Sequence, residues 1–348
     1  MTVTWDGDAV ARSEATLDRV LHALGNPPLR ELVGVGHRVV HGGPHLTRPV
    51  VIDARTLASI EAVTALAPLH DPPAVAVIHV VRRRAPEVRQ VACFDTAFHA
   101  RMPEAVRRYP VPASWTETDD IRRYGFHGLS VEWSVRRSAE LLATPVRQLR
   151  IVVAHLGAGA SVTAVDRGRG VHTSMGYTPL EGLMMATRSG SIDPGLLIER
   201  IRTGGRAAED VEADLVHRSG LLGVGGSADM RVLVERAASG DRGARLAIDM
   251  FVDRAAAAIA ASASRLPALD AIVFTGGIGE HAGTVRASIV RRLAVLGIAP
   301  ISRSTGRGDV ILGGSSSGPA VIRVEAREDL VIAAAVLAST RLASISRA

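Results

Sequence analysis

Four side chains in this sequence could together form a site that acts on an anion, and each lies beside a predicted turn. Arg38 ends an apolar run before a glycine turn, Asp95 ends another, and His127 stands between two glycines. Arg188 lies in a segment of small residues. Arginine offers a rigid fork of donors to carboxylate or phosphate, and a carboxylate at the carboxyl end of a buried strand is well placed for a site. The set favours an enzyme that acts on anions. The simpler interpretations are that Arg38 is a surface arginine, that Asp95 is a helix N-cap and that His127 is a structural histidine.

Three glycine-rich turns follow predicted strands and could hold phosphate oxygens. They are Gly157–Gly159, Gly225–Asp229 and Gly276–Glu280. Backbone amides that are not crowded by a Cβ can cradle a phosphate. None of the turns completes a dinucleotide or P-loop fingerprint, and all 41 basic residues other than histidine are arginine. The absence of lysine excludes a Walker-type loop and a Schiff-base lysine.

Several other classes of protein are disfavoured by the residue types. The single cysteine, Cys93, excludes an internal disulfide and a cysteine-ligated zinc site. His37, His41 and His45 have the spacing of metal ligands on a helix, but the glycines around them oppose a helix. The net charge of +6 comes from scattered arginine pairs without interleaved aromatic residues, which speaks against a nucleic-acid groove. The sequence shows no nucleophile elbow, which is a G-x-S-x-G turn between a strand and a helix, and it contains no H-E-x-x-H motif.

The elements that must position these residues alternate between strand and helix, which is typical of the α/β class. A length of 348 residues and an apolar fraction of 47% predict about two domains with aliphatic cores. Strands are expected over Leu32–Val40, Val88–Phe94, Ile151–Leu156, Ser161–Val165, Gly168–Thr173, Ala271–Thr275 and Ala320–Val324. Helices are expected over Ser130–Ala143, Arg245–Arg265 and Leu330–Leu342, and after caps at Asp71, Thr178, Asp193 and Asp229.

Eight segments, in order along nearly the whole chain, resemble the acetate kinase family, which is grouped with the sugar kinases, Hsp70 and actin. They are GHRVVHGG (36–43), LAPLHDPPAV (66–75), FDTAFH (94–99), RRYGFHG (122–128), AHLGAGAS (154–161), SMGYTPLEGLMMATRSGSIDPG (174–195), DMR (229–231) and TGGIGEH (275–281). Such enzymes reversibly transfer the γ-phosphoryl group of ATP to acetate, giving acetyl phosphate and ADP. The resemblance implies this reaction, with Mg²⁺ as cofactor and ATP as co-substrate.

The fold that the resemblance implies is α/β, with two RNase H-like (actin-like ATPase) domains and an active site in the cleft between them. The first domain would span residues 1–146 and be completed by the C-terminal helix 329–348; the second, nucleotide-binding domain would span 147–328. The family opens with a strand and the loop Asn-x-Gly-Ser-Ser-Ser-x-Lys. This chain has no such segment, and Ser13–Leu24 already resembles the helix that precedes GHRVVHGG. We therefore expect a first domain that is truncated at its N-terminus.

The resemblance also assigns roles to individual residues. Asp95, His127 and Arg188 would be catalytic, and Glu328 would contact Mg²⁺. The residues that would bind the carboxylate substrate are Arg38, Val40, Leu69, His70, Phe126 and Pro179. The residues that would bind nucleotide are His155, Leu156, Gly157, Ala158, Gly159, Asp229, Met230, Arg231, Gly277, Ile278, Gly279, Glu280 and His281.

This chain departs from the family pattern at four matched positions. Ala158 and His281 replace asparagines, Ser191 replaces an aspartate, and Val131 replaces a second histidine. Two hypotheses follow: an acetate kinase, with propionate as the alternative substrate, or a catalytically weak or inactive paralogue that binds nucleotide or a protein partner. For a member of this family we also expect a homodimer. The single cysteine and the absence of a signal peptide or a membrane-length apolar run predict a cytoplasmic protein without membrane partners, and the scattered arginines predict no nucleic-acid partner.

Overall fold

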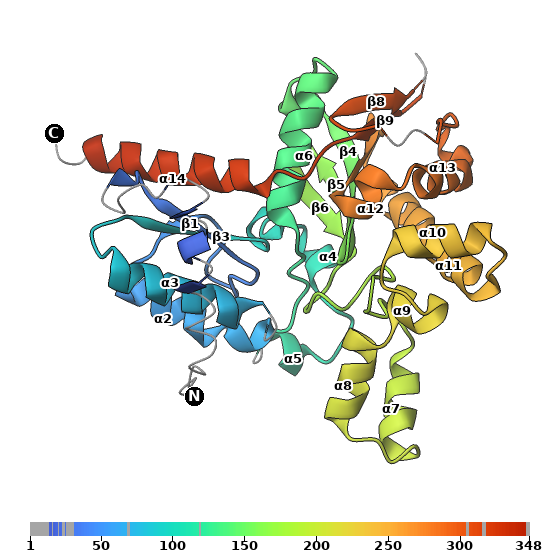
Figure 1. Cartoon of the computed structure of the whole chain (residues 1–348), viewed down its shortest axis with the longest axis horizontal. Coiled ribbons are helices and arrows are strands. Elements are labelled where there is room, and N and C mark those ends of the chain that lie inside the picture. Colours follow the sequence, from blue (N-terminus) through green and yellow to red (C-terminus); the bar gives the residue numbers. More distant parts are fainter. Residues whose placement is uncertain are drawn as a thin grey trace. The chain divides into compact units, whose positions relative to one another are not determined.

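The computed structural model describes residues 14–15, 17–19, 21–22, 25, 31–67, 70–117, 120–303, 306–314 and 318–345. By their internal contacts the residues form two compact units, which we call the first and second unit. The first unit comprises residues 1–100, 126–129 and 327–348, and the second comprises 101–125 and 130–326. Each unit contains a β-sheet with helices, which confirms the α/β class (Figure 1). The predicted domain boundary at residue 146 is a different division and stays a prediction.

The sheet of the first unit has the strand order β1-β3-β2 in the described part of the chain. β1 (Val35–Val39) and β3 (Gln90–Phe94) are parallel, and β2 (Val50–Val51) is antiparallel to β3. α14 (Glu328–Ile345) lies along one face, and α2 (Ala54–Ala62) and α3 (Asp71–Arg84) lie on the other (Figure 1). Glycine lets α14 approach β1, because a Cβ on Gly36 would lie 2.2 Å from Ile332 Cγ2.

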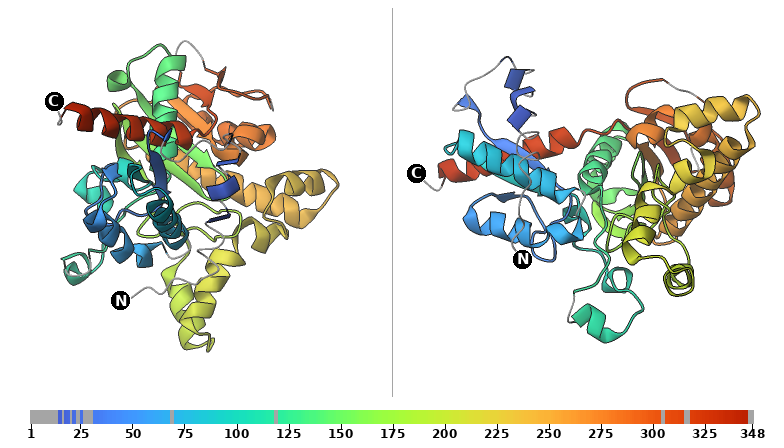
Figure 2. Two further views of the ribbon diagram at one scale, coloured as in Figure 1. Left: turned by 60° about the vertical axis from the view of Figure 1, so that its left-hand side comes forward. Right: turned by 60° about the horizontal axis from the view of Figure 1, so that its bottom comes forward.

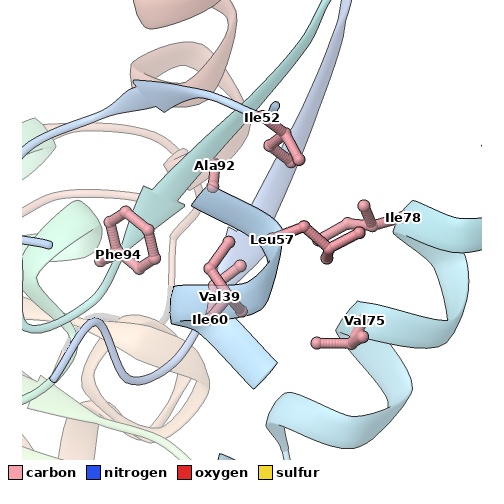
Figure 3. Packing of buried hydrophobic residues seen from close by; sticks show 8 residues of the cluster. All are labelled: Val39, Ile52, Leu57, Ile60, Val75, Ile78, Ala92 and Phe94. Atoms are coloured by element: carbon pink, nitrogen blue, oxygen red, sulfur yellow. The ribbon is translucent and has the colours of Figure 1, made fainter. Parts of the chain in front are cut away.

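Aliphatic side chains and Phe94 fill the space between this sheet and α2 and α3, in agreement with the low aromatic content. Figure 3 shows the eight buried residues of this core converging from two strands, two helices and the segment after β2. They are Val39, Ile52, Leu57, Ile60, Val75, Ile78, Ala92 and Phe94. Side chains alternate across a strand, so the residues next to Val39 on β1 and next to Ala92 and Phe94 on β3 face α14.

The second unit is built on a six-stranded mixed sheet with the order β6-β5-β4-β7-β9-β8. β4, β7 and β9 are parallel, while β5, β6 and β8 run antiparallel to their neighbours. The strands are β4 (Arg150–Leu156), β5 (Ala160–Asp166), β6 (Arg169–Thr173), β7 (Ala271–Thr275), β8 (Val310–Gly313) and β9 (Ala320–Arg323). The predicted strand pair after Gly159 is therefore confirmed as β5 and β6.

Helices flank this sheet and extend from it. The longest, α11, packs against β4 and β5, and α10 packs along α11 in the views of Figure 2. The remaining bounds are α4 (Glu104–Arg107), α5 (Ala113–Glu117), α6 (Gly128–Leu141), α7 (Pro194–Arg202), α8 (Ala208–His217), α9 (Gly220–Gly225), α10 (Met230–Ala238), α11 (Arg242–Ala263), α12 (Gly276–His281) and α13 (Gly283–Arg292). Short 3₁₀ turns cover Thr64–Leu66, Ala97–His99, Val146–Gln148 and Ala294–Leu296. Among the described residues, no helix is both long and apolar enough to cross a membrane.

Two predicted helix caps are wrong, one of them at a helix whose start was predicted correctly. The segment after Thr178 forms turns rather than a helix, and Glu181 binds Arg123 and Tyr109 instead of capping a helix. α3 begins at Asp71 as expected, but its N-cap is His70, and the Asp71 carboxyl accepts hydrogen bonds from the segment after β1. In both cases a distant partner takes the side chain that the local pattern assigns to a cap.

Candidate active site

Strand alternation brings Arg38 and Asp95 to the face of the first unit's sheet that α14 covers. Arg38 is two residues from Gly36, which contacts α14, and Asp95 follows Phe94, which belongs to the opposite core. The Asp95 amide donates to the Val39 carbonyl at 3.1 Å, so the ladder continues one residue past β3. Glu328 is the first residue of α14. Three charged side chains from distant parts of the sequence therefore meet at one place.

Arg38 binds both carboxylates. Its Nε and Nη2 donate to the two Asp95 oxygens at 3.0 and 2.6 Å, and Nε lies 3.1 Å from Glu328 Oε2. The Asp95 side chain is 1% exposed, whereas that of Arg38 is 41% exposed. Burial disfavours the charge on Arg38, but Asp95 and Glu328 outweigh it and raise its pKa. Burial raises the pKa of Glu328, and Asp95 adds to the shift although Arg38 opposes it.

His127 lies beside this cluster on a tightly held segment of the first unit. The Gly128 amide donates to the Asp95 carbonyl at 2.9 Å, and buried His99 donates through Nε2 to the Phe126 carbonyl at 2.8 Å. His127 itself has a φ of 57°, a left-handed conformation that side chains rarely adopt. Gly128 is required there, because a Cβ would lie 2.2 Å from the Asp95 carbonyl oxygen. The backbone is therefore fixed on both sides of His127.

Of the residues that the resemblance assigns to the carboxylate substrate, only some lie in one unit; the apolar ones, Val40, Leu69, Phe126 and Pro179, would contact its methyl group. Val40 and Phe126 are buried in the first unit, and the His41 ring meets the Phe126 ring edge-on with centroids 5.5 Å apart. His70 is half-buried at the N-cap of α3. Leu69 lies outside the described residues, and Pro179 belongs to the second unit. The apolar pocket for a methyl group stays a prediction.

Arg188 belongs to the second unit, and two of its contacts are with a carbonyl oxygen and a sulfur atom. Its Nη1 donates to the Pro179 carbonyl at 3.1 Å and lies 3.9 Å from the Met185 sulfur. Burial lowers the pKa of Arg188. The loop around it has no room for extra atoms, since a Cβ on Gly220 would lie 2.7 Å from the Arg188 carbonyl oxygen. The backbone of Arg188 is thus closely packed, and the residue lines a large cavity.

This cavity has a volume of about 1320 Å³ and lies entirely in the second unit. β4 and β7 are parallel with His155 opposite Thr275, so the two turns that follow them emerge at the same edge of the sheet. A Cβ on Gly157 would lie only 3.8 Å from the Gly277 amide nitrogen. The sequence predicted each turn separately, and the pairing of β4 with β7 brings them together.

Most of the predicted nucleotide residues line this cavity. Those that do are Gly157, Ala158, Asp229, Met230, Arg231, Gly277, Ile278, Glu280 and His281. Four others lie close to the turns without being part of the wall: His155, Leu156, Gly159 and Gly279. His155 shares a 2.8 Å hydrogen bond with Ser130, and its Nε2 would be 3.6 Å from a Cβ on Gly157.

Sequence analysis missed several residues of the cavity wall. The polar ones are Thr187, Glu235, Thr284, Arg307 and Glu325. Arg307, between two glycines, carried a weak signal, because such a position lets a side chain reach a ligand; the others carried none. The replaced family positions differ in their surroundings. Ala158 and His281 line the cavity, whereas Ser191 accepts from the Gly182 amide and Val131 is fully buried.

The donor set tests whether a divalent cation fits. Mg²⁺ is bound through one or two carboxylates together with substrate phosphates and water rather than by an all-protein cage. Within the described ranges there is no group of three or more metal-ligating side chains. Glu328, half-buried with a carboxylate partner nearby in Asp95, supplies oxygen ligands of the required kind.

Comparison with known proteins gives the class to which this fold and site belong. A sequence profile of the acetokinase family matches residues 6–334. An acetate kinase of Deinococcus radiodurans is 45% identical over 325 residues, covering 92% of this chain and 82% of that protein. With 36% identity and a TM-score of 0.85, the crystal structure of Porphyromonas gingivalis acetate kinase covers 89% of this chain and 78% of its own.

A propionate kinase from Francisella tularensis is also similar in structure. It is 39% identical with a TM-score of 0.86 and covers 92% of this chain and 82% of its own. The chain belongs to the acetokinase family, and the resemblance drawn from its motifs is confirmed.

Proposed function

We propose that this protein is a phosphotransferase that moves the γ-phosphoryl group of ATP to acetate, reversibly, giving acetyl phosphate and ADP. The observation that carries the proposal is the cavity of about 1320 Å³ with two glycine turns and Arg188 in its wall, in a member of the acetokinase family. A carboxylate oxygen of acetate forms a bond to the γ-phosphorus, and the bond to the oxygen shared with the β-phosphate breaks. The leaving electron pair stays on ADP.

The second unit would hold the nucleotide. Backbone amides of the Gly157 and Gly277 turns would donate to phosphate oxygens, and Asp229 and Arg231, joined by a 2.7 Å ion pair, would face the nucleoside. Arg188 would offset charge on the migrating phosphoryl group. Burial lowers the pKa of Arg188, and in a partly buried place the interaction of a guanidinium with the charge of a ligand is stronger than in water.

The first unit would hold the acceptor. Arg38 would orient the carboxylate, Asp95 would fix the Arg38 fork, and His127 would donate to the transferred phosphoryl group. Phosphoryl transfer requires in-line positioning and fixed positive charge rather than covalent chemistry, and these side chains are of that kind. Glu328, with Asp95 near it, would hold Mg²⁺; when bound, the cation supplies charge that offsets the phosphate oxygens.

Propionate is a second candidate substrate, favoured by the likeness to a propionate kinase. One methylene changes binding in an apolar pocket by only about 1–3 kcal/mol, so both acids are expected to react with different efficiency. A homodimeric assembly, which rests on the family resemblance, and a cytoplasmic location, which rests on the sequence expectations given above, complete the proposal.

The test is formation of acyl phosphate, trapped as hydroxamate, from ATP, Mg²⁺ and acetate or propionate. Arg188→Ala should lose the product, whereas Arg200→Ala, a change to an exposed arginine of α7, should keep it. A folded wild-type protein that binds ATP but forms no hydroxamate from either acid would contradict the proposal. That result would favour a nucleotide-binding paralogue without this activity.

A further inference from the structure

The turn that follows β1 is held by side chains rather than by a strand or helix. Val40 and His41 donate their amides to Asp71 Oδ1 at 2.9 and 3.2 Å, and Gly42 donates to Thr96 Oγ1 at 3.2 Å. Gly43 donates to His41 Nδ1 at 2.8 Å. One carboxyl oxygen thus satisfies two of four consecutive amides directly after the strand that carries Arg38.

We infer that Asp71 is a positioning residue that holds this turn, and with it Arg38 and Val40, in the arrangement that binds the carboxylate substrate. The inference rests on the proposed function for its catalytic consequence. Asp71 is fully buried at the first position of α3. Pro72 and Pro73 follow it and have no amide hydrogens, so the first turn of α3 offers the Asp71 carboxyl few hydrogen-bond donors. The carboxyl therefore accepts from the amides that follow β1.

The surroundings favour the neutral form of the Asp71 carboxyl. His41 accepts a hydrogen bond at Nδ1, so its ring is neutral, and Arg38 is engaged by Asp95 and Glu328. Asp71 Oδ2 has no hydrogen-bond partner among the described residues. Burial raises the pKa of Asp71 to about 7, the two amides oppose the shift, and the negative charge of Asp95 adds to it.

The titratable groups on the adjoining segments are His41 after β1, Asp95 after β3 and His70 before α3. A carboxyl whose pKa is higher in the folded than in the unfolded chain binds its proton more strongly when folded. Its contribution to stability is therefore present at low pH and is lost as the pH rises towards about 7. Above that pH a buried charge lies against the turn.

The experiment compares Asp71→Asn and Asp71→Ala with wild type. Asparagine keeps an acceptor oxygen for the two amides and removes the ionisation, whereas alanine removes the acceptor. The melting temperature of Asp71→Asn minus that of wild type should rise by several degrees between pH 5 and pH 8.5. Asp53→Asn is the matched control, because this exposed N-cap of α2 is ionised at both pH values and should give a constant difference. If the melting-temperature difference between Asp71→Asn and wild type were also the same at both pH values, the inference that the Asp71 carboxyl is neutral at low pH would be wrong.

The positioning role is tested by kinetics and by amide exchange. Asp71→Ala should lower kcat/KM for acetate about 10- to 100-fold, the scale of a small misplacement, and should lose exchange protection at residues 40–41. Asp71→Asn should keep the protection, and its kcat/KM relative to wild type should increase through pH 7. Equal losses in both variants at every pH would refute the role. If wild type itself forms no acyl phosphate, the proposed function fails, and the melting and exchange measurements still decide the state of Asp71.

Discussion

The two arginines that matter most to the proposed reaction are held in opposite ways in the two units. Arg38 is clamped by the carboxylates of Asp95 and Glu328, whereas Arg188 donates to a backbone carbonyl and lies near a thioether sulfur. Neighbouring charge raises the pKa of the first, and burial lowers that of the second. Two carboxylates fix the direction of the Arg38 guanidinium and offset part of its charge, whereas the contacts described for Arg188 are with a carbonyl oxygen and a sulfur atom. The difference suits an acceptor-orienting role for Arg38 and a charge-offsetting role for Arg188.

The largest expected effect is on Arg188. Arg188→Ala should lower kcat by about two to four orders of magnitude with a smaller change in the KM for acetate, because the charge acts in the transition state. Arg188→Lys should restore little, since an ammonium lacks the planar fork. Steady-state kinetics with thermal melting as the control for folding make the measurement. An unchanged kcat in Arg188→Ala would contradict the charge-offsetting role of Arg188.

Arg38 should differ from Arg188 by contributing to stability. Arg38→Ala leaves the buried Asp95 carboxylate without its main partner and should cost about 1–3 kcal/mol, less than a fully buried pair because Arg38 is 41% exposed. Asp95→Asn combined with Arg38→Ala should regain part of that loss. Denaturant unfolding of the four proteins in a double-mutant cycle gives the coupling. A coupling near zero would mean that the clamp does not stabilise the fold.

A variant of Glu328 can distinguish its ion pair with Arg38 from its proposed role in binding Mg²⁺. Glu328→Ala should raise the Mg²⁺ concentration for half-maximal rate by about tenfold, because few protein ligands hold the ion. Asp329→Ala is the control, since this neighbour pairs with Arg327 on the exposed side. The rate is measured across a Mg²⁺ titration. The same Mg²⁺ dependence in wild type and Glu328→Ala would show that Glu328 serves only the Arg38 clamp.

The smallest expected effect is a gain in the nucleotide cavity. Ala158 is exposed in its wall, where the family has asparagine, so a longer polar side chain has room to reach a ligand. One added hydrogen bond contributes about 0.5–1.5 kcal/mol, so Ala158→Asn should lower the KM for ATP a few-fold. Ala158→Ser, with a shorter reach, should give less. A higher KM in Ala158→Asn would indicate that the side chain obstructs the phosphates.

Local patterns predicted the elements well where the signal was local. The strand Ala271–Thr275 agrees with β7 at both ends, and Asp193 and Asp229 cap α7 and α10 as their positions predicted. A short apolar run and an N-cap side chain depend on neighbours within a few residues. Thr178 and Asp71 were misjudged as helix caps because Glu181 and Asp71 bind groups 30 or more residues away.

The sequence by itself determined the α/β class, the turns, the family and the residue types that can handle a carboxylate and a phosphate. Only the tertiary structure decided which of these residues meet. The register of β1 on β3 places Arg38 beside Asp95, and the return of α14 adds Glu328 from 290 residues further along the chain. The pairing of β4 with β7 joins two glycine turns into one cavity. These contacts depend on strand pairing and packing between segments far apart in the sequence, so the spacing of neighbouring residues does not predict them.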